Sequence, residues 1–138
     1  MFFTPVNYPA VGISAIASMV VGFLWYSPML FGTPWMKLSG LDDKKMKAAQ
    51  KDMPKTYGIS FVASLITAYV IATLVNSMLV SSLSDGLALG TVLWLGFVAT
   101  TMVTGVLFQK MPWALFLINS GCQLASILAM SAILTVWI

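Results

Sequence analysis

The sequence predicts an all-α integral membrane protein, a bundle of four transmembrane helices. Of its 138 residues, 59% are hydrophobic and 8% are charged, whereas a soluble domain carries about 25% charged residues. Four long stretches carry no charged side chain, and each suffices for one crossing of a bilayer but not for two. All seven lysines fall into two of the connections between these stretches.

The uncharged stretches give the expected positions of the spans. A helix needs about 20 apolar residues to cross a hydrocarbon core about 30 Å thick. Transmembrane strands alternate apolar and polar residues over about ten positions, and these stretches are continuously apolar. We therefore expect one transmembrane domain over residues 1–138, with spans at about 9–31, 57–80, 86–108 and 113–137 and a loop at about 32–56.

The first span has two interpretations, a cleaved secretory signal and a retained helix. A signal peptide opens with positive charge and ends at small residues. No Lys or Arg precedes this span, and its Phe23–Tyr26 segment is bulky. We therefore expect a retained transmembrane helix.

The lysines set the expected orientation. Six of the seven lie in the loop between the first two spans, and Lys110 lies between the last two. With four spans these connections share one side of the membrane, which the positive-inside rule makes cytoplasmic. Both termini and the Ser81–Asp85 turn are then expected outside, in a multi-pass protein of a plasma membrane.

The loop at 32–56 is the segment with soluble character, and Leu41–Lys51 within it is expected to form a short helix. One interpretation is a surface helix that contacts anionic lipid headgroups, at about 1 kcal/mol per nearby lysine. The other is a solvated loop whose charges only set topology. The lysines concerned are Lys44, Lys45, Lys47 and Lys51.

Asp85 is the one acidic residue outside this loop. With Ser84 it stands at the start of the third span, where the first backbone N–H groups of a helix lack partners. The sequence favours a helix cap formed by Ser84 or Asp85. A substrate or proton site at Asp85 is the alternative.

Small residues are expected to line the helix contacts, because helices in lipid associate through close packing and interhelical hydrogen bonds. They recur at four-residue spacing in the spans, which favours a compact bundle. The expected packing positions are Ser14, Ser18, Gly22, Gly86, Gly90 and Gly121.

Further polar residues cluster in the half of the spans nearer the lysine-rich side. One interpretation is a small polar pocket open to the cytoplasm. The other is an interhelical network in which Asn119 and Gln123 bond to threonines. The set comprises Tyr26, Ser27, Ser60, Ser64, Thr100, Thr101, Thr104, Asn119 and Gln123. Trp94 lies deep in the third span, where its indole N–H needs an acceptor.

Composition excludes several classes of site. The chain has no His, Glu or Arg and a single Cys, so zinc, haem and iron–sulfur centres and Ser–His or Cys–His nucleophiles lack their groups. The predicted spans lack the ionisable residues that proton-coupled transporters use as relays. We expect no enzyme activity, no metal or cofactor and no nucleic-acid partner.

Two regions of the chain resemble a known family. Gly22–Gly32, followed by Trp35, is similar to the opening signature of domain-of-unknown-function family 1761. Leu95–Thr101 and Leu115–Gly121 resemble its second half, in the same order.

This resemblance implies a small bacterial inner-membrane protein with four helices, in a family with no assigned activity. Many members follow the Asn-x-Gly of the second half with Tyr and then His. This chain has Cys122 and Gln123 at those places, so a role for an imidazole there does not carry over.

Two functions remain open at this point. The first is a non-enzymatic bundle that acts by helix–helix association, as a homo-oligomer or as a subunit of a larger membrane-protein complex. The second is a transporter or channel for a small neutral or amphipathic solute, with the polar residues as a cytoplasm-facing pocket. The lipid bilayer is the expected partner in both.

The orientation predicts opposite labelling of two cysteine variants made in a Cys122→Ser background. Ser82→Cys should react with a membrane-impermeant maleimide in intact cells, because it lies in the external turn. Lys47→Cys should react only once the cytoplasmic face is opened. Labelling of Ser82→Cys from the cytoplasmic face alone would reverse the orientation.

Overall fold

The computed structural model describes residues 6–27, 29–39 and 53–137, which form helices and no strands. In chain order the elements are α1 (Tyr8–Trp25), α2 (Gly32–Ser39), α4 (Met53–Ser77), α5 (Leu83–Leu93), η1 (Trp94–Ala99), α6 (Thr100–Gln109) and α7 (Trp113–Val136). α5, η1 and α6 run on as one helix. Together with α1, α4 and α7 it gives four helices long and apolar enough to cross a membrane, which confirms the all-α prediction.

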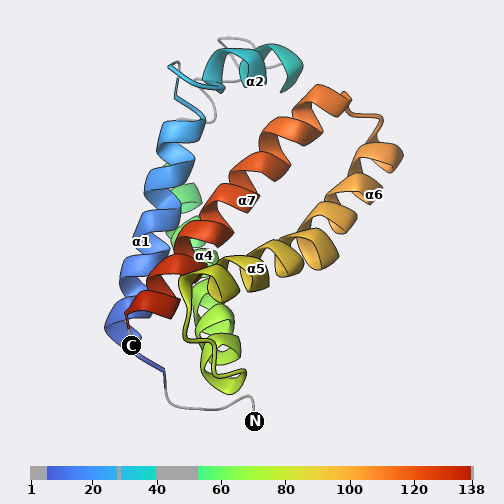
Figure 1. The fold of residues 1–138 in the computed structure, drawn as a ribbon. Helices are drawn as coiled ribbons and strands as arrows, with labels where there is room; N and C mark the ends of the chain where they lie inside the picture. The colour runs from blue at the N-terminus through green and yellow to red at the C-terminus, as the bar shows by residue number, and fades with distance from the viewer. Residues whose placement is uncertain (1–5, 28, 40–52, 138) are drawn as a thin grey trace.

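α7 is the central helix of the bundle. It lies between α1 and the α5–α6 helix in Figure 1, and it also contacts α4 and α2. Of the most apolar stretch of each span, 44% is buried in α7 and 11% in Leu83–Gln109. The third span therefore lies at the periphery of the bundle.

The hydrophobic core lies between α1, α4 and α7, toward the start of α1 and the end of α7. Ala10 and Ala68 are fully buried there, and alanine allows helix backbones to approach closely in lipid. The buried core residues are Val6, Ala10, Val11, Ala68, Ile71, Ala72, Val75, Ile127, Met130 and Leu134.

α1 ends at Trp25, six residues before the predicted end of the first span. Pro28 follows in the sequence, and proline disfavours a helical conformation in the residue before it. The chain then folds back, and the N–H of Phe31 donates to the carbonyl of Trp25. A Cβ at Gly32 would overlap the carbonyl oxygen of Tyr26, so the turn requires glycine at that position.

The N-cap of α5 is Ser82, and not Ser84 or Asp85 as the sequence suggested. The Ser82 Oγ accepts from the N–H of Asp85 at 3.2 Å. A serine at the cap satisfies this N–H from three residues away, so the Asp85 carboxylate is not needed for that role.

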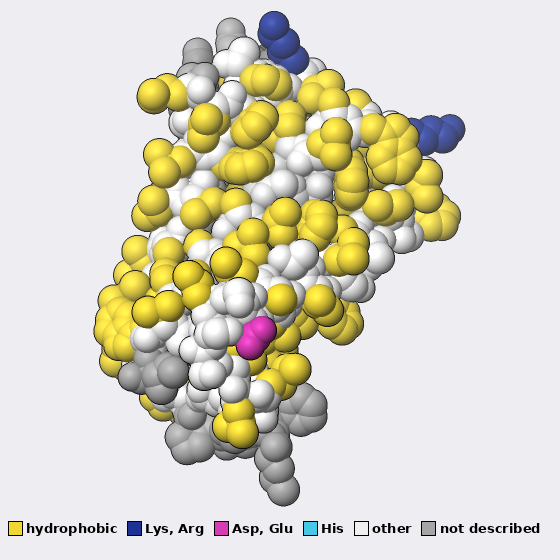
Figure 2. Space-filling view, viewed as in Figure 1, with side chains coloured by type: hydrophobic (Ala, Val, Ile, Leu, Met, Phe, Trp, Pro, Cys, Tyr) yellow, Lys and Arg dark blue, Asp and Glu magenta, His cyan; other side chains and the backbone are white. Residues whose placement is uncertain are grey.

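The described lysines lie at the opposite end of the bundle from Asp85. Lys37 belongs to α2, Lys55 to the first turn of α4, and Lys110 caps α6. Figure 2 shows basic side chains at the α2 end and an acidic one toward the other end. The loop residues Lys44, Lys45, Lys47 and Lys51, with the predicted Leu41–Lys51 helix, lie outside the described residues.

Gly86 and Gly90 form the contact of α5 with α7. Both are buried, and a Cβ at either would overlap a hydroxyl oxygen of α7: Thr135 Oγ1 for Gly86, and Ser131 Oγ, at 2.6 Å, for Gly90. A Cβ occupies the position of a glycine α-hydrogen, so each hydroxyl oxygen faces a Cα–H group. Neither oxygen has a conventional partner within the described chain.

The other predicted packing residues divide into two groups. Ser14 is fully buried on α1, and a Cβ at Gly121 would lie 2.9 Å from the Trp25 indole. Ser18 is half-buried, and a Cβ at Gly22 would meet nothing within 4 Å. Close approach therefore does not extend to Gly22, because the Trp25 indole fills the α1–α7 contact at that end.

Replacing the close-contact glycines tests this packing. Gly86→Ala and Gly90→Ala should each lower the free energy of unfolding by about 1–3 kcal/mol, because the new methyl group overlaps α7. Gly12→Ala is the matched control, since a Cβ there meets nothing within 4 Å, and it should be neutral or stabilising by up to about 1 kcal/mol. Reversible unfolding in detergent micelles measures all three. Equal losses at Gly12 and Gly86 would contradict the close approach.

Candidate functional site

Two adjacent aromatic residues at the end of α1 bind α7. The Nε1 of Trp25 donates to the Ile118 carbonyl at 2.8 Å. The hydroxyl of Tyr26 donates to Asn119 Oδ1 at 2.7 Å. Because Ile118 and Asn119 are consecutive, the two bonds fix the end of α1 against one turn of α7.

Trp94, at the start of η1, makes a bond of the same kind. Its Nε1 donates to the Ser120 carbonyl at 2.8 Å. A carbonyl oxygen has two lone pairs, so it can accept an indole N–H and still serve the helix. Successive residues of a helix are about 100° apart, so the carbonyls of Ile118 and Ser120 accept from nearly opposite sides of α7.

Trp25 and Tyr26 are each in contact with a second aromatic ring. The Trp25 ring centroid lies 4.8 Å from that of Phe31, and the Tyr26 ring lies edge-on to Trp35 of α2 at 5.5 Å. Phe31 lies in the turn after α1 and Trp35 lies in α2, so this turn and α2 close over the end of the bundle. We call Trp25, Tyr26, Trp94 and Asn119 the α7 junction.

Gly121 and Cys122 lie next to the junction along α7. Gly121 leaves room for the Trp25 indole. Cys122, the next residue, is buried. The hydrogen-bonding groups of the junction are two indoles, a phenol and an amide. No cluster of three or more His, Cys, Asp or Glu able to hold a metal occurs in the described ranges.

The threonines of α6 do not join the junction. Thr100, Thr101 and Thr104 are exposed, and each hydroxyl donates to the carbonyl four residues earlier in its own helix. The predicted network between these threonines and Asn119 is therefore not formed. A threonine hydroxyl can satisfy itself on its own backbone, so a polar side chain within a span does not have to reach a neighbouring helix.

The unpredicted π-helical segment η1 directly precedes these threonines. In a π turn each backbone N–H donates to the carbonyl five residues earlier, and such a turn alters the direction of a helix. The third span bends between α5 and α6 in Figure 1. The hydroxyls of Thr100 and Thr101 donate to the carbonyls of Gly96 and Phe97 inside η1.

The remaining predicted polar residues lie apart from one another. Ser27 Oγ donates to the Leu24 carbonyl within its own turn. Ser60 is exposed and Ser64 half-buried on α4, and Gln123 is exposed on α7. Within the predicted set, Tyr26 and Asn119 are the pair that a hydrogen bond between different helices brings together.

A double-mutant cycle tests the junction. Tyr26→Phe and Asn119→Leu should show a coupling of about 0.6–1.7 kcal/mol in the free energy of unfolding, the range of interhelical hydrogen bonds in membranes. Asn119→Leu with Thr104→Val is the control cycle and should show no coupling, because Thr104 bonds within its own helix. A coupling for Thr104 as large as that for Tyr26 would contradict the arrangement.

One of three comparisons with known proteins finds a match. The chain matches the family described as "Protein of unknown function (DUF1761)" over residues 9–135. No curated protein and no solved structure matches it. The matched range contains the turn after α1 and the α7 junction, and it confirms the resemblance carried by Gly22–Gly32. The chain therefore belongs to the DUF1761 family.

Proposed function

We propose that the chain is a non-enzymatic integral membrane protein that acts by association of its helices with those of a second copy. The observation that carries this proposal is the exposed state of Leu83–Gln109. Of its most apolar stretch 11% is buried, compared with 22–44% in the other three spans. A span with so little contact inside its own bundle has a face free for another helix or for lipid.

The exposed face of η1 and α6 has the composition of a helix contact. Gly96, Thr100 and Thr104 follow one another at four-residue spacing, and all are exposed. We call these three residues the Gly96 stripe. A Cβ at Gly96 meets nothing within 4 Å, and the threonine hydroxyls are bonded to their own backbone. Such a row lets a second helix approach closely in lipid.

A second copy is the occupant that this surface favours. A two-fold interface joins the same patch on both subunits, so the patch must be complementary to itself. A narrow row of small residues between large ones meets that requirement. Leu95, Phe97 and Leu107 flank the row and are 58%, 72% and 63% exposed.

We further propose that the basic end faces the cytoplasm of a bacterial cell, with the protein in the inner membrane. Lys37, Lys55 and Lys110 share that end, and the positive-inside rule favours retention of such an end. The start of α1 and the end of α7 would then face outward.

The transporter alternative has less support from the geometry. It requires the threonines of α6 and the amides of α7 to converge on one pocket. The threonine hydroxyls donate to their own backbone, and Gln123 is exposed. The proposal that the protein lacks catalytic activity is supported by the absence of His, Glu and Arg from the sequence.

Self-association is tested by Förster transfer between labelled copies in liposomes at several protein-to-lipid ratios. The wild type should show transfer above random proximity. Gly96→Leu should weaken association by about tenfold or more, because the new side chain separates the helices. Gly58→Leu is the matched control on α4, where a Cβ also meets nothing within 4 Å, and it should leave transfer unchanged.

Two outcomes would overturn the proposal. One is transfer in the wild type no higher than random proximity gives at every ratio. The other is an equal loss of transfer in Gly96→Leu and Gly58→Leu. In either case a partner of different sequence, purified at fixed stoichiometry, would instead place the chain in a larger complex.

A further inference from the structure

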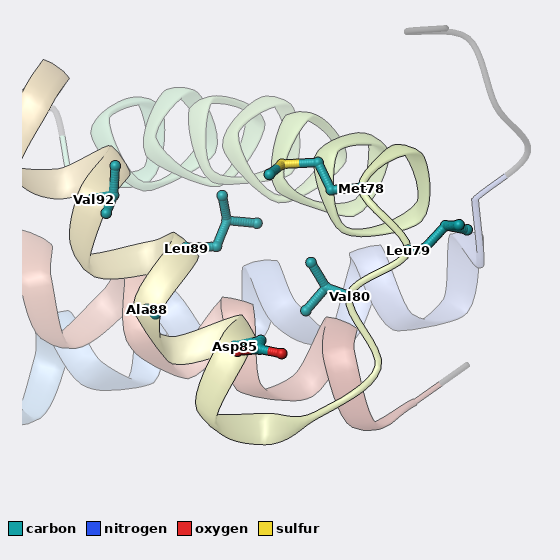
Figure 3. Close-up of a pocket in the computed structure, with 7 residues that line it drawn as sticks. All are labelled: Met78, Leu79, Val80, Asp85, Ala88, Leu89 and Val92. Atoms are coloured by element: carbon teal, nitrogen blue, oxygen red, sulfur yellow. The ribbon is translucent and has the colours of Figure 1, made fainter.

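An open cleft lies at the end of the bundle opposite the lysines, and the proposed function does not use it. Its volume is about 400 Å³. One wall is the α4–α5 connection at Met78–Val80, and the other is formed by Asp85, Ala88, Leu89 and Val92 of α5 (Figure 3). Among the described side chains that line it, Asp85 is charged and the others are apolar.

The cleft changes from charged to apolar along the axis of α5. Asp85 belongs to the first turn of this helix. Val92 is seven residues further on, about 10 Å along the axis at about 1.5 Å per residue. When α5 crosses a bilayer, Asp85 lies near the headgroups while Ala88, Leu89 and Val92 lie progressively deeper. A phospholipid presents the same order, with a polar head followed by acyl chains.

Among the described residues no lysine lies near the Asp85 carboxylate, so it is available to a cation from outside the chain. Its helix is capped by Ser82, so capping does not require this side chain. Lys37, Lys55 and Lys110 lie at the far end of the bundle. Asp85 is exposed, and a carboxylate attracts an ammonium group and disfavours an anionic headgroup.

We propose that this cleft binds a phospholipid whose headgroup carries a primary ammonium group, of the phosphatidylethanolamine type. The ammonium pairs with the Asp85 carboxylate, and an acyl chain lies against Ala88, Leu89 and Val92. A primary ammonium donates charge-assisted hydrogen bonds to a carboxylate, whereas a trimethylammonium group has no N–H to donate. The site therefore distinguishes phosphatidylethanolamine from phosphatidylcholine with the same acyl chains.

The test is native mass spectrometry of the full chain in detergent micelles, with equal amounts of the two lipids bearing identical acyl chains. The wild type should retain phosphatidylethanolamine about two- to fivefold more than phosphatidylcholine, which is the size of an exposed ion pair. Asp85→Asn should retain both lipids equally. Asp85→Glu, which keeps the carboxylate, should restore the preference.

Two further variants complete the experiment. Ala88→Trp should lower retention of both lipids, because the indole fills the apolar part of the cleft. Lys110→Gln removes a charge at the opposite end and should behave as the wild type. Equal retention of both lipids by the wild type, or a preference that survives Asp85→Asn, would overturn the proposal. Neither result depends on whether the protein self-associates.

Discussion

The bonds from two indole N–H groups to the backbone of α7 determine where three of the spans meet. Trp25 and Trp94 come from different helices and donate to carbonyls two residues apart on α7. A buried N–H without an acceptor is costly in an apolar medium, so these two side chains must reach α7 at this level. The turn after α1, with its required glycine, comes directly after the Trp25 attachment, and Trp35 of α2 packs edge-on against Tyr26.

The two ends of α7 are held by different kinds of contact. Toward the lysine end the space between helices is filled by indole rings, and Gly121 makes room for one of them. Toward the other end, Gly86 and Gly90 bring α5 against the hydroxyls of Ser131 and Thr135. Large donors fix the position of the helices at one end, while small residues set their separation at the other.

The sequence was sufficient for the number of spans and for part of their packing. The spacing of the charged residues predicted the four helices. The Gly86-x-x-x-Gly90 spacing predicted a close contact between helices, and both glycines lie against α7. The sequence did not predict the hydrogen-bond partners of the threonines, because the Thr100 hydroxyl can bond to a neighbouring helix or to its own. Nor did it predict the π turn, which has no simple periodic signature. The backbone acceptors of the Trp94 and Trp25 indoles could not be predicted from the sequence either. An indole that needs an acceptor can be recognised from sequence, but a backbone carbonyl that provides one cannot.

Because the acceptors on α7 are main-chain carbonyls, the residues that carry them can vary within the family. Ile118 and Ser120 contribute their carbonyls to the junction, and every residue type carries a carbonyl. Substitution at these two positions can therefore preserve both indole bonds as long as α7 stays helical and the new side chain fits. Positions 25 and 94 have no such freedom, since tryptophan is the residue whose ring supplies an indole N–H. Relatives that keep this architecture should tolerate substitutions at the two acceptor positions of α7 while retaining the two tryptophans that donate to its backbone.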